Sequence, residues 1–393
     1  MNQSPPSDQT SPMPGAIAGN LGSPTCIEGV NIDGVVTKYT HAGETAEIFT
    51  RYWIDSDHPL FHRLASGLHE TIYGLSKEKQ IDIKNYKTVL VVIKPDSTAQ
   101  LWLDTAAIAF QAITRRSVSA GLIVMEQDIA DIISMSFPLV EIEAEDKVII
   151  LFRQDWRFGL YFDFNPEKSL NKNLMEASLG QLYRRMKYHH IYDLIRDEEL
   201  FSQLKKEGWF PFIELIGQEF QTLTDLHFNG QSKASYENLL VQSFNDARLT
   251  SLVDRWKSKP YLQGKTPILE SIKRSFIAED PVAVIKVVLT EIEGILLQAY
   301  KAKTGETAKT WKLLDFAISS AEDKTGSADT LFLTAEFAKH LKEHVYAVFD
   351  PSSNDGQATS RHAVGHGVAT AESYTMTRAL QAILTLDQLA FYI

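Results

Sequence analysis

The fold class is decided where the chain reads Lys147-Val148-Ile149-Ile150-Leu151-Phe152, then Gln154-Asp155, then Trp156-Arg157-Phe158-Gly159-Leu160-Tyr161-Phe162-Asp163-Phe164. β-Branched and aromatic residues dominate both runs, which are too short to form independent helices. After Pro166 the spacing of apolar residues shifts from two to about 3.6, which is typical of helices. We therefore expect an α+β protein, in which a β-rich N-terminal domain precedes an all-α helical bundle.

Working outward, the run 88–93 and the run 99–103 flank the turn Pro95-Asp96-Ser97, and they predict a β-hairpin. The apolar run 122–125 predicts a further strand. Residues 61–68 carry an amphipathic helical pattern.

Length and composition also indicate how the chain is divided into domains. At 393 residues it exceeds what one core usually organises. Residues 1–35 are rich in proline, glycine and small polar residues, so we expect a disordered tail there. The remaining boundaries place a β-rich α+β domain at 36–168, a helical connector at 169–262 and a helical bundle at 263–393.

Four helices are expected in the last segment. The first begins at Pro281, behind Asp280 as N-cap, and ends near Gly305. A shorter one covers 311–318. The apolar stripe of the third runs from Leu333 to Val348, and the fourth begins at about residue 373 and continues to the C-terminus. Short connections of this kind favour an up-down bundle.

The charge and the cysteine count narrow the function. The formal net charge is −11, so the surface repels polyanions unless basic residues are concentrated in one place. Cys26 is the single cysteine, which excludes an internal disulfide and fits a reducing compartment. Neither a secretory signal nor a run of about 20 apolar residues is found. We expect a cytoplasmic protein that does not enter a membrane.

The segment Ser360-Arg361-His362-Ala363-Val364-Gly365-His366-Gly367 is the most informative for chemistry. If it is helical, His362 and His366 share a face at i and i+4. Cleavage of RNA by its own ribose hydroxyl requires a base, an acid and a cation on the phosphate oxygens. An imidazole suits proton transfer near neutral pH, and an arginine binds phosphate with its planar fork. This chemistry needs neither a metal nor a cofactor.

Arg361, the polar His362, three further residues and then His366 resemble the ribonuclease motif of the HEPN superfamily, placed before the last helix of a four- or five-helix bundle. The resemblance covers roughly residues 265–393. It implies that Arg361 and His366 are the catalytic pair and that His362 stands beside the arginine. It also implies a metal-independent endoribonuclease of the toxin or antiphage-defence kind, which leaves a 2′,3′-cyclic phosphate and forms a homodimer through the C-terminal bundle.

Other readings of the motif are open. HEPN domains also serve as non-catalytic modules for dimerisation or for binding RNA or nucleotides, and the spacing can arise by coincidence. A zinc site at His362 and His366 lacks the glutamate that zinc proteases carry after the first histidine, where this chain has Ala363. The N-terminal domain would choose the target or hold the bundle inactive, which leaves room for a regulatory partner.

Remaining candidates have simple structural alternatives. The basic clusters 184–190 and 115–116 could grip phosphate or could be solvated faces. Glu291 or Glu293 could face the motif and orient a histidine, or could be surface carboxylates. The aromatic residues of 156–164 could stack on bases or fill a core. The sequence has no P-loop, dinucleotide fingerprint or nucleophile elbow.

Overall fold

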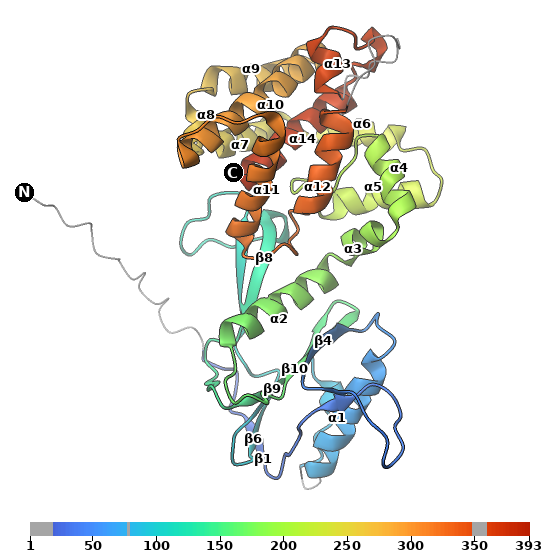
Figure 1. Cartoon of the computed structure of the whole chain (residues 1–393), viewed down its shortest axis with the longest axis vertical. Helices are drawn as coiled ribbons and strands as arrows, with labels where there is room; N and C mark the ends of the chain where they lie inside the picture. Colours follow the sequence, from blue (N-terminus) through green and yellow to red (C-terminus); the bar gives the residue numbers. More distant parts are fainter. Residues whose placement is uncertain (1–18, 77–78, 348–359) are drawn as a thin grey trace, which may run out of the picture. The chain divides into compact units, whose positions relative to one another are not determined.

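The computed structural model describes residues 19–76, 79–347 and 360–393 and divides the chain into two compact units. Within those ranges, the sheet unit contains residues up to 111 together with 134–187, and the helical unit contains 112–133 and 188–393 (Figure 1). The expectation of an α+β protein, with a β-rich N-terminal part and a helical C-terminal part, is confirmed.

Six strands form the antiparallel sheet of the sheet unit. Their order is β1 (Thr25–Ile27), β6 (Ala99–Leu103), β5 (Thr88–Ile93), β9 (Lys147–Gln154), β10 (Arg157–Asp163) and β4 (Arg51–Asp55). The predicted hairpin β5–β6 is present, and β9 and β10 form a second hairpin. Asp155 takes a φ of +52° in the tight turn of the second hairpin.

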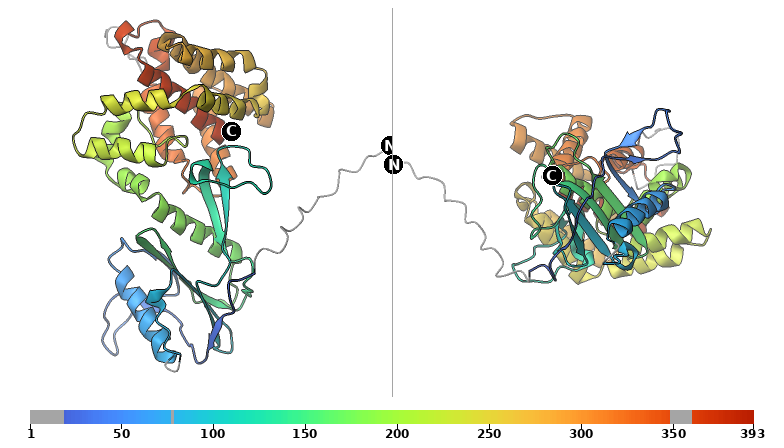
Figure 2. Two further views of the ribbon diagram at one scale, coloured as in Figure 1. Left: turned by 180° about the vertical axis from the view of Figure 1, so that it is seen from behind. Right: turned by 90° about the horizontal axis from the view of Figure 1, so that it is seen from below.

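The sheet is buried on both faces, which explains why its strands are nearly continuous apolar runs. Val89 and Val91 face a core formed with α1 (Phe61–Leu75), whereas Leu90 and Val92 face a core formed with α2 (Lys172–Lys187). Successive side chains of a strand point to opposite faces, so one run serves both cores. Figure 2 shows the helices and the sheet from two further sides.

Close contact between α2 and the sheet depends on Gly159 in β10. A Cβ atom there would lie 2.7 Å from the Met186 sulfur and 2.9 Å from Leu182 Cδ2. A glycine within a strand often marks such a close approach. The remaining elements of this unit are the ribbon of β2 (Val35–Val36) and β3 (Ile48–Phe49), the 3₁₀ turn Ile83–Asn85, and parts of β7 (Ala109–Thr114) and β8 (Ile129–Ser136).

Several sequence-based boundaries need correction. Thr25–Ile27 pairs with β6, so the ordered sheet begins inside the predicted tail 1–35, whose first 18 residues lie outside the described ranges. The segment 169–262 is not a separate connector, because α2 packs on the sheet and residues 188–262 belong to the helical unit. The predicted strand 122–125 is an exposed loop followed by the 3₁₀ turn Glu126–Asp128.

That loop is fixed by polar contacts rather than by strand pairing. The Arg116 guanidinium donates to both Asp128 carboxylate oxygens at 2.7 Å, and the Met125 N–H donates to the same carboxylate at 2.8 Å. The pair holds the pKa of Asp128 below its ordinary value, mainly through the hydrogen bond from Arg116. The strand prediction for 122–125 was therefore wrong, because it used apolar composition alone.

From residue 188 on, the helical unit has seven helices before the first of the four predicted ones, and the last of the seven, α9, already lies inside the predicted bundle segment 263–393. They are α3 (His189–Arg196), α4 (Glu198–Lys206), α5 (Gln218–Phe228), α6 (Ala234–Ser243), α7 (Asp246–Lys257), α8 (Pro260–Gln263) and α9 (Thr266–Ile277). The bundle continues with α10 (Pro281–Thr304), α11 (Thr310–Thr325), α12 (Thr334–His340), α13 (Arg361–Gly365), the 3₁₀ turn Ala371–Ser373 and α14 (Met376–Tyr392). No helix within the described ranges is long and apolar enough to span a membrane.

Local signals placed the ends of α10 correctly. The Asp280 carboxylate accepts the Ala283 N–H at 3.0 Å, Pro281 opens the helix, and Gly305 ends it with a φ of +76°. Helix α12 ends earlier than the apolar stripe predicted, because Leu341–Val345 winds as a π-helix. Val348, the last residue of that stripe, lies outside the described ranges.

Helix α14 is the central helix of this unit and is buried on every side from Ala379 to Tyr392. Its polar residues are satisfied inside the core. Asp387 pairs with Arg255 at 2.7 Å and accepts from the Trp256 indole at 2.8 Å, and Gln388 accepts the Ile213 N–H at 2.8 Å. The motif helix itself packs against α10, which in turn packs against this buried terminal helix.

Candidate functional site

The motif segment forms the short helix α13. Ser360 caps its N-terminus, since its Oγ accepts the Ala363 N–H at 3.4 Å and donates to the Ala347 carbonyl at 3.1 Å. Gly367 leaves the helix with a φ of +72°. The N–H groups of Val368 and Ala369 then both donate to the Ala363 carbonyl and close the turn. Serine and glycine thus confine the helix to five residues.

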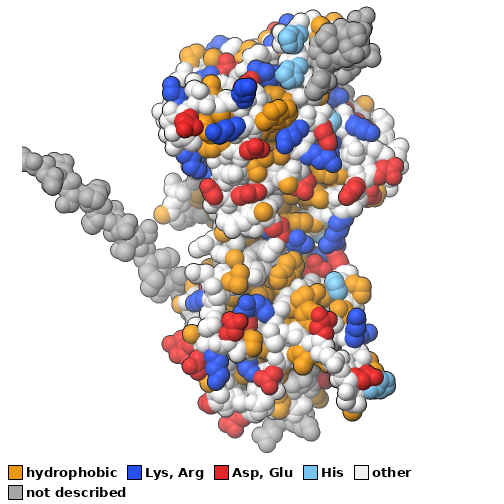
Figure 3. Space-filling view, viewed as in Figure 1, with side chains coloured by type: hydrophobic (Ala, Val, Ile, Leu, Met, Phe, Trp, Pro, Cys, Tyr) orange, Lys and Arg blue, Asp and Glu red, His pale blue; other side chains and the backbone are white. Residues whose placement is uncertain are grey.

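Burial divides α13 into an anchored side and an open side. Ala363 and Val364 are 1% and 5% exposed and contribute to the core. His366, just past the last residue, is exposed, and Arg361 and His362 are half-buried. Figure 3 shows histidine side chains at the surface of the end of the helical unit where Figure 1 labels α13.

Arg361 is held by an acid from another helix. Its Nη2 forms an ion pair with Oε2 of Glu293 on α10, while Oε1 of Glu293 accepts the Thr310 hydroxyl at 2.7 Å. The Arg361 and Glu293 side chains are 29% and 27% exposed. The sequence prediction that Glu293 could face the motif is confirmed in position, but its partner is the arginine rather than a histidine. Glu291 pairs with Lys265 instead.

Tyr346 lies beneath the motif and was not identified from the sequence. The Arg361 guanidinium carbon lies 6.0 Å from the centre of its ring, and the His362 ring meets it edge-on at 6.4 Å. Tyr346 is 2% exposed, and no described residue is a hydrogen-bond partner of its hydroxyl or of the buried Arg361 Nε. Burial, and to a lesser degree the Glu293 carboxylate, raises the pKa of Tyr346. Tyr346 lies in the apolar stripe that runs from Leu333 to Val348, so nothing in the sequence distinguished it from a core residue.

The structure brings the first two of the three predicted catalytic residues together at Tyr346. Arg361 and His362 converge on Tyr346, and His362 shares a helical face with His366. In a regular helix, positions five apart are rotated by about 140° from one another, and His366 directly follows the last residue of α13.

The remaining candidates from the sequence are engaged elsewhere. Arg184 is 3% exposed, and the Arg185 guanidinium lies 5.3 Å from the Trp53 ring, so the 184–190 segment is not a solvated basic face. Arg115 is largely buried, and burial lowers its pKa. The aromatic side chains of Tyr161, Phe162 and Phe164 fill cores and cannot stack on bases; Trp156, 87% exposed in the β9–β10 turn, is the exception.

In the described part of the chain, His, Cys, Asp and Glu side chains nowhere gather in groups of three or more that could hold a metal ion. The zinc reading of the two motif histidines therefore gains no third ligand from those residues.

Comparison with protein-family models, with curated proteins and with solved structures gives no match.

Proposed function

We propose that the chain is a metal-independent endoribonuclease of the HEPN type, with its active site at α13 and a role in toxicity or antiphage defence. The observation that carries the proposal is the division of this helix. Its apolar residues anchor it to a packed core, while a guanidinium and two imidazoles are left at or near the surface. A helix that served packing alone would gain nothing from this concentration of chemistry in a chain of net charge −11.

In the proposed reaction, the ribose 2′-oxygen attacks the adjacent phosphorus and the 5′-oxygen leaves. The products are a 2′,3′-cyclic phosphate and a 5′-hydroxyl, and no water is consumed. His366 takes or gives the proton because an imidazole titrates near neutral pH. Arg361 donates to the phosphate oxygens as negative charge develops on them. His362 lies beside Arg361 and completes the polar surface.

Substrate must compete with Glu293 for Arg361. An ion pair at this degree of exposure stabilises by on the order of 1 kcal/mol, because solvent screens it. A phosphodiester that accepts two hydrogen bonds from the guanidinium can displace such a carboxylate. Thr310 keeps its hydrogen bond to Glu293 during the exchange. Glu293 is thus a resting partner of Arg361.

In this proposal the chain forms a homodimer through the helical unit, and the dimer brings Arg361 and His366 to the same phosphate. Two copies related by a two-fold axis can place the arginine of one beside the histidine of the other. The substrate in this proposal is a cytoplasmic RNA. The sheet unit would select that RNA, restrain the site or receive a regulatory partner.

The second candidate is a non-catalytic HEPN-like module for dimerisation or for binding RNA or nucleotides. The ion pair of Arg361 with Glu293 favours it, because a neutralised arginine can be a structural residue. Under this alternative Arg361 and His366 contribute to an interface and no RNA is cut.

Incubation of the purified chain with tRNA and mRNA in excess chelator separates the two candidates. The enzyme yields fragments with cyclic-phosphate ends, and Arg361→Ala and His366→Ala lose them. The matched controls are Arg274→Ala and His41→Ala, which alter exposed residues elsewhere and should retain activity. Cleavage that survives His366→Ala, or no cleavage of any RNA tested, would reject the nuclease; thermal unfolding confirms that each variant is folded.

A further inference from the structure

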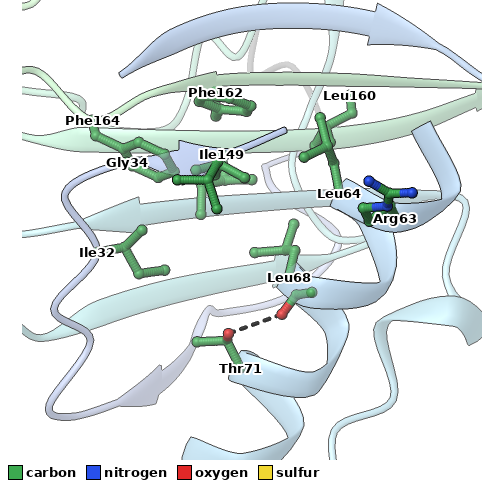
Figure 4. A pocket seen from close by; sticks show the side chains of 13 residues that line it. Ile32, Gly34, Arg63, Leu64, Leu68, Thr71, Ile149, Leu160, Phe162 and Phe164 are labelled. Carbon is green, nitrogen blue, oxygen red and sulfur yellow. Dashed lines mark hydrogen bonds between the residues drawn. The ribbon is translucent and has the colours of Figure 1, made fainter. Parts of the chain in front are cut away.

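A pocket of about 340 Å³ lies between α1 and the six-stranded sheet, entirely within the sheet unit. Its floor is made by Ile149, Leu160 and Phe162 of β9 and β10, and one wall is the segment that contains Val35 and Val36 (Figure 4). Pockets that hold small molecules in proteins occupy roughly 300–1,000 Å³ and are mostly apolar. The size and lining therefore suit a small apolar ligand.

The space exists because of one stripe of α1. Arg63, Gly67 and Thr71 follow one another at intervals of four and line the pocket, beside Leu64 and Leu68. Gly67 contributes no side chain, and a Cβ there would meet no atom within 4 Å. The Thr71 hydroxyl donates to the Gly67 carbonyl at 2.9 Å, which leaves its methyl group for the pocket (Figure 4). Space is therefore left on this side of α1 at Gly67, between the side chains of Arg63 and Thr71.

The opposite wall is brought close by another glycine. A Cβ on Gly34 would lie 2.1 Å from Ile48 Cγ2, so only glycine allows β2 and β3 to approach at this point. The ribbon covers the pocket from that side without filling it.

Among the described residues that line the pocket, Arg63 is the one that carries a charge. Its Nη1 donates to the Thr37 carbonyl at 3.1 Å, and within the described ranges no carboxylate pairs with it. Two other arginines of the unit are neutralised, Arg51 by Asp163 at 2.6 Å and Arg157 by Asp57 at 2.9 Å. The mouth of an apolar pocket thus carries a positive charge, and the Arg63 guanidinium has further N–H donors beyond the one used for Thr37.

We propose that this pocket binds a small amphiphile, an aliphatic chain with an anionic head group such as a carboxylate or a phosphate. The chain replaces water on the Ile149, Leu160 and Phe162 floor, and the head accepts hydrogen bonds from the Arg63 guanidinium. This site is separate from α13, and the inference stands whether or not the chain cleaves RNA.

Titration calorimetry on the full chain tests the proposal with decanoate, kept below its micellar concentration. We expect saturable binding with one site, much weaker binding of decanol and none of decyltrimethylammonium, because the last places a cation against Arg63. Decyl phosphate should bind as decanoate does. Arg63→Gln should weaken decanoate binding about tenfold, since it removes a charge-assisted hydrogen bond. Arg153→Gln, an exposed arginine of the same unit, should have no effect.

Two glycines of α1 provide a matched pair of variants. Gly67→Leu fills the pocket and should abolish binding, whereas Gly74→Leu, on the same helix but outside the pocket, should leave it unchanged. Both changes raise helix propensity, so neither is expected to unfold the helix. Thermal unfolding of the two variants checks this directly.

Three results would overturn the proposal: no binding of decanoate by the wild-type chain, equal binding by the two glycine variants, or equal binding of decanoate and decyltrimethylammonium. Each readout is binding rather than activity. Failure here is therefore distinct from failure of the nuclease.

Discussion

Arg361 on α13 is neutralised by Glu293 on α10, and the Thr310 hydroxyl holds the other oxygen of that carboxylate at 2.7 Å. The arginine that the motif assigns to phosphate binding is thus already paired with a carboxylate. Whether Glu293 restrains the site or merely supports the fold can be decided by experiment.

Glu293→Gln is expected to increase RNA affinity and the rate of cleavage about fivefold. The amide keeps a carbonyl oxygen for Thr310 but removes the charge that competes with phosphate, a competition on the order of 1 kcal/mol. The gain should shrink at high salt, which screens partly exposed charges. RNA-binding titrations and cleavage rates at two salt concentrations measure it.

Glu291→Gln is the control, because Glu291 lies on the same helix and pairs with Lys265 instead of the motif. It should leave both quantities unchanged. Loss of affinity in Glu293→Gln alone would show that the glutamate positions Arg361 rather than competing for it.

A composite site predicts complementation between two inactive variants. A dimer of one Arg361→Ala chain and one His366→Ala chain retains one site with both groups intact. Random mixing should therefore restore about a quarter of wild-type activity, as expected for a two-fold interface. The measurement is cleavage after the two variants are co-expressed or mixed. Activity no greater than that of either variant alone would argue against sites shared between copies.

Acid should destabilise the helical unit through His340 and His344. Burial lowers the pKa of His344 to about 4 and that of His340 well below its ordinary value, with Lys205 adding to both shifts; Arg378 lowers the His344 pKa further, and Glu343 opposes it. Both histidines are then neutral in the folded chain but bind protons in the unfolded chain below about pH 6.5. Stability is fully present above that pH and is lost as the pH falls toward about 4.

Melting temperatures between pH 4.5 and 7.5, taken about one unit apart, measure this dependence. His344→Gln should flatten the curve, whereas His41→Ala, which alters an exposed histidine of the sheet unit, should not. A slope that is the same in all three proteins would contradict this assignment.

Gly159→Ala should destabilise the sheet unit by about 1–3 kcal/mol, the usual cost of overpacking. The added methyl group would lie 2.7 Å from the Met186 sulfur and 2.9 Å from Leu182. Urea unfolding measures the change. Met186→Ala in the same chain should recover part of the loss, because it removes the closest atom; a double variant whose losses simply add would mean that the clash is relieved in another way.

Much of the fold could be predicted because its signals are local. Asp280, Pro281 and Gly305 define α10 through neighbours within one helical turn, and short runs of β-branched and other apolar residues define β5 and β9. The run 122–125 shows the limit of such signals, since its apolar residues are exposed and the true strand begins at Ile129. The motif segment was identified from its residue types and their spacing. Tyr346, which packs beneath it, could not be identified in this way, because nothing in the sequence distinguishes it from other apolar positions.

The sequence by itself determined the α+β class, the β5–β6 hairpin, the ends of α10 and the presence of a guanidinium and two imidazoles within six residues. Those features depend on neighbouring residues, whose geometry the chain restricts directly. Only the tertiary structure decided that Glu293 pairs with Arg361 rather than with a histidine, that the packing of α2 on the sheet requires Gly159, and that a pocket opens beside Gly67. These contacts join segments far apart in the chain, and their distances are set by how whole helices and sheets pack.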